Sequence, residues 1–211
     1  MTFEEFLIYA TVFATATLAV SGIIQAARCD MDIFGGGVLA LVCALGGGTL
    51  RDLLIGASPV FWITDLLYLS VILVTTVLTA WLLRFVPVGR GLRFAMLDVA
   101  DAFGLALFAI LGAQKALSFG LSEPIAVVMG VMTGVAGGII RDVITQQQPA
   151  VMRGDSFYAT AGIIGCVVYC ALEGVLTETV SMLVGMTVIL VLRLAAIRWK
   201  FKIPSLIKPG S

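Results

Sequence analysis

Two Arg-Asp dipeptides hold the residues of this chain that are best placed to do chemistry. Arg51-Asp52 and Arg141-Asp142 each begin three residues after a run of glycines, inside apolar stretches long enough to cross a bilayer. A charge at membrane depth costs at least about 2.5 kcal/mol, and such residues usually mark an ion or substrate pathway. The two dipeptides therefore predict a polar pathway through a membrane protein.

The dipeptides belong to an internal repeat that appears when the sequence is shifted by ninety residues without a gap. Other matched pairs are Gly22 and Gly112, Ala26 and Ala116, Val38 and Val128, Gly47-Gly48 and Gly137-Gly138, Pro59 and Pro149, Asp65 and Asp155, and Tyr68 and Tyr158. Apolar sequence of low complexity would not preserve Arg, Asp, Pro and Tyr together by chance. The chain is therefore built from two related halves.

The composition is that of an integral membrane protein, with 60% hydrophobic residues, 12% charged residues and a mean hydropathy of +1.10. A spanning helix needs about 20 mainly apolar residues. Seven such spans are predicted, at Phe6–Ala27, Phe34–Ile55, Phe61–Leu83, Phe94–Leu117, Pro124–Thr145, Ser156–Leu172 and Ser181–Ile197. The first span starts with acidic residues and matches the fourth, so we interpret it as a retained helix. The expected fold is all-α, with one transmembrane domain over residues 1–211.

Each half of the repeat contains an odd number of spans, so the two copies cross the membrane in opposite directions. The predicted architecture is two inverted three-helix repeats, at residues 6–83 and 94–172, plus a seventh helix at 181–197. Inverted repeats are common in membrane transport proteins. At about 1.5 Å per residue, the glycines of the second span lie a little past the bilayer middle. Arg51-Asp52 then lies toward the outside, and Arg141-Asp142 lies toward the cytoplasm.

Charge distribution predicts the orientation of the chain. One face receives most basic residues, namely Arg28, Arg84, Arg90, Arg93, Arg153, Arg198, Lys200, Lys202 and Lys208, and the other receives Glu4, Glu5, Glu123, Glu173 and Glu178. The positive-inside rule then places the N-terminus outside and the C-terminus in the cytoplasm. The formal charges balance at thirteen of each sign, so nothing favours a nucleic-acid partner.

The residue inventory argues against an enzyme. Histidine is absent, which excludes Ser-His or Cys-His catalysis, and the four cysteines have no metal-ligand spacing. We expect free thiols, no cofactor and no resident metal. The one metal expected is a transient monovalent cation near the glycines.

The glycine runs Gly46-Gly47-Gly48 and Gly137-Gly138 admit two interpretations. Glycines allow helices to pack closely. They also weaken a helix by about 1 kcal/mol each relative to alanine. Because they occur at matching midplane positions and precede charges, we favour a break in both helices, with free carbonyls that coordinate a cation.

The arginines need partners within the membrane. Adjacent residues on a helix point about 100° apart, which argues against an ion pair within each dipeptide. Asp98 and Asp101 share a face of the fourth span, and one of them is the predicted partner of Arg141. The alternative is a charged network that only holds helices together. Lys115, at the far end of the same span, is expected to extend to the interface.

Three segments carry a resemblance to a known family: GGGTLRDLL with the following Pro59 to Trp62, DAFGLALFAILGAQKAL at 101–117, and GVAGGIIRDVI at 134–144. They resemble the prokaryotic TRIC channels, homologues of the trimeric intracellular cation channels that are also labelled glycine transporter domain proteins. The resemblance implies a seven-helix protomer, a homotrimer with one pore in each protomer, and kinks at the two glycine runs. Ala136 stands at the first place of the second run, which implies a milder kink there. Gating stays unassigned.

The leading functional hypothesis is a passive monovalent cation channel of the bacterial inner membrane, permeable to potassium or sodium and in contact with lipids. Its pathway would run between the second and fifth spans and include Gly46–Gly48, Arg51, Asp52, Asp98, Asp101, Gly137, Gly138, Arg141 and Asp142. No Thr-Val-Gly-Tyr-Gly filter is present, so strong potassium selectivity is not expected. The alternative is a secondary transporter of a small amino acid such as glycine, in which arginine binds the substrate carboxylate. A scaffold without transport would leave the paired charges unexplained.

Overall fold

The computed structural model describes residues 2–85, 90–152 and 157–199. These residues form seven α-helices, α1 (Phe3–Arg28), α2 (Ile33–Ile55), α3 (Leu66–Leu82), α4 (Arg90–Ser118), α5 (Glu123–Ile144), α6 (Ala159–Leu172) and α7 (Glu178–Trp199), and the short 3-10 helix η1 (Ala150–Met152). The predicted all-α fold with seven helices is confirmed. Asp155 of the repeat, Ser156 at the predicted start of the sixth span, and the basic residues Arg153, Lys200, Lys202 and Lys208 lie outside the described residues.

Local sequence signals define the helix ends. Thr2 and Glu5 form a capping box at the start of α1. The Asp32 carboxylate accepts a hydrogen bond from the Gly35 N–H at 2.7 Å and caps α2. Gly56 ends α2 in the left-handed region, with φ 71°, where only glycine is free of strain.

Five of the helices are long and apolar enough to cross a membrane, and α3 and α6 are shorter apolar helices of 17 and 14 residues. The predicted start of the third span at Phe61 is wrong, because α3 begins at Leu66. Asp65 caps the helix by accepting from the Leu67 N–H at 2.9 Å. Phe61 instead belongs to the connection that folds back over the end of α2, where its N–H donates to Asp52. A span of 17 residues is about 26 Å long, slightly less than the hydrocarbon core.

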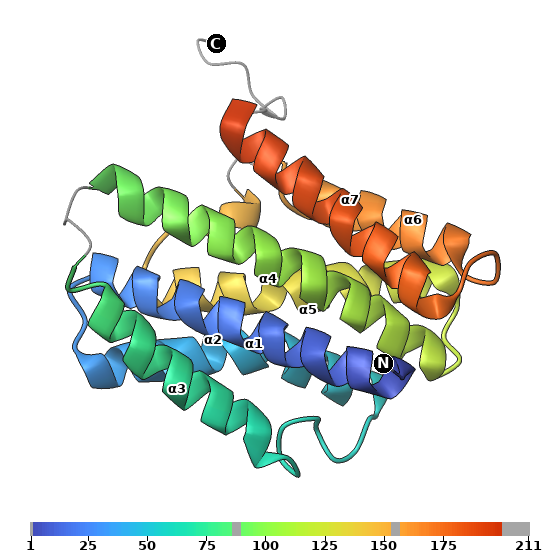
Figure 1. Cartoon of the computed structure of the whole chain (residues 1–211), viewed down its shortest axis with the longest axis horizontal. Helices are drawn as coiled ribbons and strands as arrows, with labels where there is room; N and C mark the ends of the chain where they lie inside the picture. Colours follow the sequence, from blue (N-terminus) through green and yellow to red (C-terminus); the bar gives the residue numbers. More distant parts are fainter. Residues whose placement is uncertain (1, 86–89, 153–156, 200–211) are drawn as a thin grey trace.

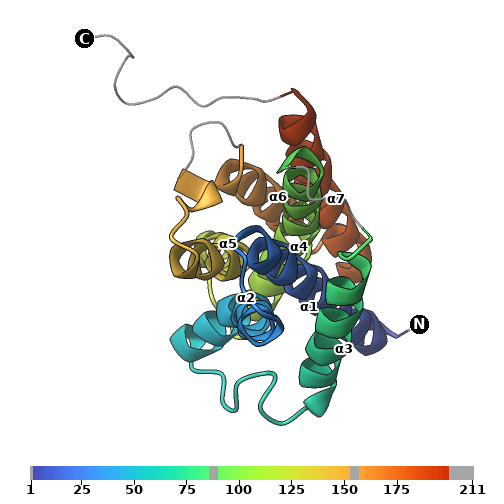
Figure 2. The same cartoon turned by 90° about the vertical axis from the view of Figure 1, so that its left-hand side faces the viewer.

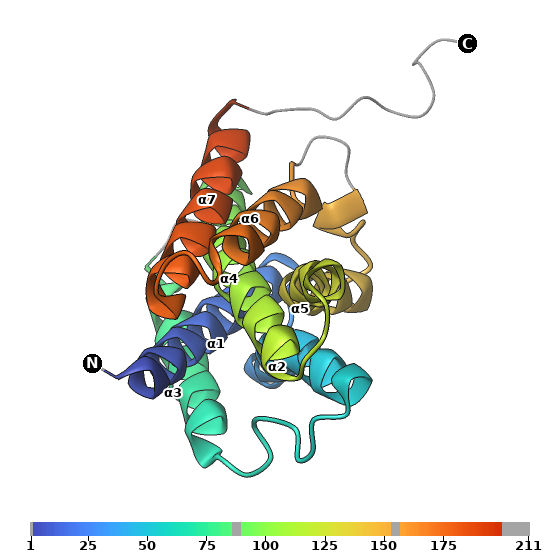
Figure 3. The ribbon, with the colours of Figure 1, turned by 90° about the vertical axis from the view of Figure 1, so that its right-hand side faces the viewer.

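Two helices of the first half pack against their counterparts in the second half. α1 contacts α4 and α2 contacts α5, while α6 and α7 lie against the far side of α4. Figure 1 shows that α1 and α4 run in opposite directions, as do α2 and α5. The end-on views in Figures 2 and 3 place α1 and α4 at the centre, with α2 and α3 on one side and α6 and α7 on the other.

The contact between α2 and α5 is made by backbone atoms. A Cβ added at Gly47 would lie 2.1 Å from the Thr133 carbonyl oxygen, and one at Gly137 would lie 2.2 Å from the Cys43 carbonyl oxygen. Gly47 and Gly137 are ninety residues apart, and so are Cys43 and Thr133. Such reciprocal contacts are expected of two copies related by a two-fold axis.

The predicted breaks in these two helices are wrong. α2 and α5 are helical from end to end through Gly46–Gly48 and Gly137–Gly138, so their carbonyl groups stay in the helical ladder. The physical reason is the close approach just described, because any side chain at Gly47 or Gly137 would collide with the opposite backbone. The glycines therefore act in packing, the interpretation that the sequence left open beside the break.

Alanine at these two glycines is expected to destabilise the protein. Gly47→Ala and Gly137→Ala place a methyl group against a rigid backbone carbonyl, and overpacking of this kind costs about 1–3 kcal/mol. The melting temperature of the purified protein should fall in both variants. Gly91→Ala is the matched control, since a Cβ there meets nothing within 4 Å. Equal melting temperatures in all three variants would contradict the close packing.

Candidate functional site

The first Arg-Asp dipeptide lies in a cluster that we call the α2 site, made of Arg51, Asp52 and Lys115. Arg51 is 5% exposed and Asp52 is fully buried. Arg51 Nη2 lies 2.7 Å from Asp52 Oδ1, and Lys115 Nζ lies 3.0 Å from the same oxygen. Two cationic groups of α2 and α4 thus share one carboxylate.

The second dipeptide lies in a cluster that we call the α5 site, made of Arg141, Asp142, Asp101 and Ser21. Arg141 Nη1 lies 2.8 Å from Asp101 Oδ1, and Arg141 Nε lies 2.8 Å from Asp142 Oδ1. The same Nη1 also donates to the hydroxyl of Ser21 on α1. All four residues are buried, so one guanidinium serves two carboxylates and a hydroxyl from three helices.

Both dipeptides form internal ion pairs, contrary to the prediction from helix geometry. The Nε–H of Arg51 donates to Asp52 Oδ1 at 2.8 Å, and Arg141 makes the same bond to Asp142. The prediction considered only the directions in which adjacent side chains leave the helix. The arginine side chain is long enough to turn back and reach its neighbour across that angle.

Two residues of α4, Asp101 and Lys115, complete the two sites. Asp101 is the ion-pair partner of Arg141 on the fourth span, as one of two alternatives predicted, whereas Asp98 lies one turn earlier and is half-buried. The prediction that Lys115 extends to the interface is wrong, because its ammonium group turns inward to Asp52. The buried carboxylate offers a stronger partner than interfacial water, and the lysine side chain keeps 26% of its surface accessible.

The second oxygen of each dipeptide carboxylate holds the connection that follows its helix. Asp52 Oδ2 accepts from the Phe61 N–H at 2.9 Å, and Asp142 Oδ2 accepts from the Ala150 N–H at 3.0 Å. Each aspartate, which lies on the helix, therefore contacts both the arginine of its dipeptide and the connection that follows the helix. Loss of either carboxylate would release the loop as well as the charge.

The two sites differ in charge because their repeat partners differ. Asp101 of the α5 site corresponds to Thr11, and Lys115 of the α2 site corresponds to Gln25, each ninety residues earlier. The α2 site has two cations and one carboxylate, a formal charge of 2 − 1 = +1. The α5 site has one cation and two carboxylates, a formal charge of 1 − 2 = −1.

Both sites face the pair of central helices α1 and α4. Asp101 and Lys115 lie on α4 two heptads apart, with Phe108 midway between them. Leu18, which corresponds to Phe108 in the repeat, packs against Gly104 of α4, where a Cβ would lie 2.3 Å from Leu18 Cδ2. Leu18 and Phe108 are each 2% exposed, so these two side chains form a buried apolar layer at the middle of this stretch of α4.

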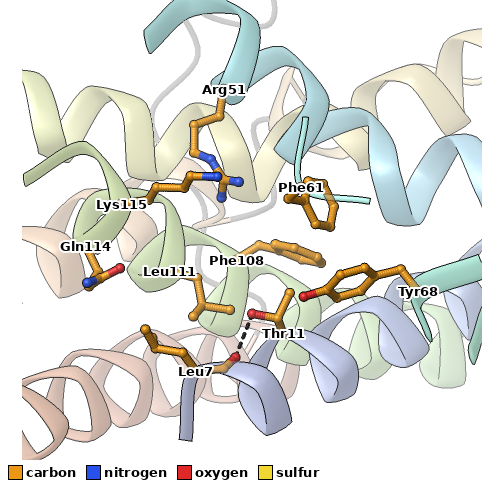
Figure 4. A pocket seen from close by; sticks show the side chains of 9 residues that line it. All are labelled: Leu7, Thr11, Arg51, Phe61, Tyr68, Phe108, Leu111, Gln114 and Lys115. Atoms are coloured by element: carbon orange, nitrogen blue, oxygen red, sulfur yellow. Dashed lines mark hydrogen bonds between the residues drawn. The ribbon is translucent and has the colours of Figure 1, made fainter. Parts of the chain in front are cut away.

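A cavity of about 160 Å³ opens beside the α2 site, and α1, α2, α3, α4 and the connection before α3 contribute to its walls. Figure 4 shows the Arg51 guanidinium and the Lys115 ammonium side by side at this cavity, with Thr11 and Tyr68 opposite them. The lining residues are Leu7, Thr11, Arg51, Phe61, Tyr68, Phe108, Leu111, Gln114 and Lys115. Within the described part of the chain, none of these lining residues carries a carboxylate.

The α5 site continues toward α7 through residues that sequence reasoning missed. The Tyr158 hydroxyl and the Asp101 carboxylate both lie against Gly138, each 3.3 Å from the position of an added Cβ. The guanidinium of Arg193, which is 3% exposed, lies 4.5 Å from the centre of the Tyr158 ring. The signals available were the repeat match of Tyr158 and the charge of Arg193 inside an apolar span.

Acidic residues gather outside the spans, where α5 and α7 begin and α6 ends. Burial, followed by the negative charges of Glu178 and Glu123, raises the pKa of the Glu173 carboxyl. Burial is the larger cause, and repulsion from the two neighbouring carboxylates adds to it. A cation at this end of the molecule would relieve that repulsion.

Comparison with known proteins identifies the family. The model of the glycine transporter family matches residues 8–84 and again residues 98–174, two segments offset by ninety residues. The chain belongs to this family. The same ninety-residue offset relates Arg51-Asp52 to Arg141-Asp142, so each family segment brings one Arg-Asp dipeptide.

Two relatives, both described as UPF0126 membrane proteins, resemble the chain over most of its length. A membrane protein of Vibrio cholerae is 47% identical over 92% of this chain and 80% of its own. The inner membrane protein YadS of Escherichia coli is 46% identical over 92% of this chain and 93% of its own. These relatives are membrane proteins, in agreement with the composition.

Solved structures confirm the resemblance to the prokaryotic TRIC channels. The TRIC trimeric intracellular cation channel orthologue of Rhodobacter sphaeroides is 33% identical, with a TM-score of 0.86 over 93% of this chain and 99% of its own. A prokaryotic TRIC channel crystallised in 0.5 M KCl is 26% identical, with a TM-score of 0.88 over 95% of this chain and 100% of its own. The seven-helix fold is therefore that of the TRIC channels.

Proposed function

We propose that the protein is a potassium-permeable channel for monovalent cations in the bacterial inner membrane. Similarity to TRIC cation channels supports ion conduction, and one similar structure is described as an orthologue of a trimeric channel. Each protomer of the proposed homotrimer carries its own pathway. The inner membrane location follows from the Escherichia coli relative.

The observation that carries the proposal is the convergence of both Arg-Asp sites on α1 and α4. Lys115 in the last turn of α4 contacts the α2 site, and Asp101 in the first half of α4 contacts the α5 site. Charged groups are thereby available at both ends of one route through the protomer, with a cavity at one of them. Paired buried charges of this kind are typical of ion pathways.

The route passes beside the α2–α5 contact and not between these helices. Backbone atoms of Gly47 and Gly137 meet the opposite helix too closely to leave room for an ion. The proposed path therefore follows α1 and α4 from the α2 site, past Leu18 and Phe108, to the α5 site. Apolar constrictions close pores by excluding water, so this conformation is closed at its middle.

We base the proposed orientation of the protein in the membrane on the opposite directions of α1 and α4. Two inverted three-helix repeats would place the α2 site toward the outside and the α5 site toward the cytoplasm, with the C-terminus in the cytoplasm. The pathway then has a positive outer end and a negative inner end. Cations would concentrate at the cytoplasmic site and meet their main electrostatic barrier outside.

Flux through the purified protein in liposomes tests the proposal. A channel should give potassium flux that rises with concentration without saturation and shows no counterflow. The family is described as glycine transporters, and this description favours one alternative. In that alternative, glycine uptake saturates and shows counterflow. Saturable glycine uptake without potassium leak would replace the channel proposal with a carrier.

A substitution in the apolar layer of Leu18 and Phe108 gives a second expected result in the liposome flux assay. Replacing Phe108 with serine should hydrate the middle of the pathway and raise potassium flux, because water and ions share the route. Tyr169→Phe is a conservative control, since it keeps the ring of another buried aromatic residue outside the path. Unchanged flux in Phe108→Ser would exclude this residue from the route.

A further inference from the structure

The α2 site beside the cavity has more cationic donors than its one carboxylate, Asp52, can neutralise. Asp52 Oδ1 accepts from Arg51 and Lys115, and Asp52 Oδ2 is occupied by the Phe61 N–H. A guanidinium has five N–H donors and an ammonium has three. Among the described residues, only Nε and Nη2 of Arg51 contact Asp52, so the Nη1 donors and two donors of Lys115 are left for a further partner.

Comparison of the two sites shows which group is missing. In the α5 site, Asp101 of α4 supplies a second carboxylate to Arg141, at 2.8 Å. The corresponding position in the α2 site is Thr11 of α1, which lines the cavity. Its hydroxyl already donates to the Leu7 carbonyl at 2.7 Å and carries no charge. The cavity therefore occupies the place that the Asp101 carboxylate fills in the other half.

Cavity size and lining limit the group that could replace this carboxylate. A volume of about 160 Å³ is smaller than the roughly 300–1,000 Å³ of sites for drug-sized ligands. Tyr68 directs its hydroxyl into the cavity opposite Arg51 and can donate a hydrogen bond (Figure 4). Gln114 also lines the wall, although its amide donates to Glu178 at 3.0 Å. These features suit a small, singly charged anion.

We propose that the cavity binds one small monovalent anion, a halide or a short carboxylate, between Arg51 and Lys115. The bound anion supplies a negative charge to Arg51, as the Asp101 carboxylate does to Arg141. It brings the formal charge of the α2 site from +1 to zero. The inference extends the proposed channel function, because a neutral outer site would let cations pass that a positive site repels. Anion occupancy would thus control cation conduction.

Binding is tested by the thermal stability of the purified full-length protein at constant potassium concentration. Chloride and acetate are compared with gluconate, which is too bulky for the cavity. A ligand that binds only the folded protein raises the melting temperature. We expect chloride, acetate or both to raise it in the unaltered protein, and the two salts separate a halide from a carboxylate site.

Two substitutions from the other half of the repeat make the test specific. Thr11→Asp installs the carboxylate found at Asp101, and Lys115→Gln installs the residue found at Gln25. Both should abolish the dependence of the melting temperature on the anion. Thr11→Asn, the uncharged counterpart of the first variant, should retain it. Equal melting temperatures of the unaltered protein in all three salts, or a shift that persists in Thr11→Asp, would overturn the proposal.

Potassium flux in the same salts separates this inference from the channel function. In the unaltered protein, flux in the effective anion should exceed flux in gluconate by about tenfold, the effect of removing one unit charge from the barrier. Absence of flux in every salt, with the melting shift retained, would reject the channel and leave the anion site. Equal flux in every salt, without a melting shift, would reject the anion site alone.

Discussion

Replacing Arg141 with alanine is expected to destabilise the protein by about 3–5 kcal/mol, the loss found when one partner of a buried ion pair is removed. Arg141 is 1% exposed, and its guanidinium holds Asp101 and Asp142 together. Without it, two buried carboxylates face each other with no cation between them. Denaturation of the purified protein in detergent measures the loss.

Arg51→Ala is the matched control, because the sequence repeat alone would assign it the same effect. Its carboxylate partner Asp52 keeps Lys115 at 3.0 Å, so the α2 site would change from a charge of +1 to zero. The expected loss of stability is therefore smaller than for Arg141→Ala. Equal losses would show that Lys115 does not compensate, and that the difference in charge between the sites has no energetic consequence.

Replacing Asp52 with asparagine is expected to reduce potassium flux by at least about tenfold, because two cations would then lie at the outer end without a carboxylate. The asparagine keeps the shape of the side chain and its acceptor for the Phe61 N–H. Liposome flux measures the effect, and the melting temperature shows whether the fold survives.

A second substitution shows whether charge is the cause. Lys115→Gln in the Asp52→Asn background returns the formal charge of the site to +1, so much of the lost flux should return. The two changes should therefore combine non-additively, as expected for side chains in contact. Flux that stays low in the double variant would show that the changed charge of the site is not the cause of the defect.

The sequence predicts the fold well because the repeat and the apolar spans are long and regular. It predicts the helix breaks wrongly because Gly47 and Gly137 look alike whether they bend a helix or admit another backbone. Only the positions of Thr133 and Cys43 on the opposite helices distinguish these roles. The residue pattern alone does not give the distance between each glycine and the opposite helix.

The sequence predicts only part of the candidate site, and the reason is related. The dipeptides and Asp101 are visible as charges within apolar spans. The inward turn of Lys115 and the roles of Thr11 and Ser21 depend on which helices meet. The ninety-residue shift does pair Thr11 with Asp101 and Gln25 with Lys115, and these unlike pairs are where the two halves differ in chemistry.

The reciprocal contact of Gly47 and Gly137 bears on how such a molecule could arise. In a symmetric dimer of half-length chains, one substitution alters both copies of a contact together. Both ends of a pathway through that dimer would carry the same charge. Once the halves are joined in one polypeptide, each can change alone, as Asp101 opposite Thr11 and Lys115 opposite Gln25 illustrate. Directionality between the two ends is therefore a property that the fused chain can have and a symmetric dimer cannot.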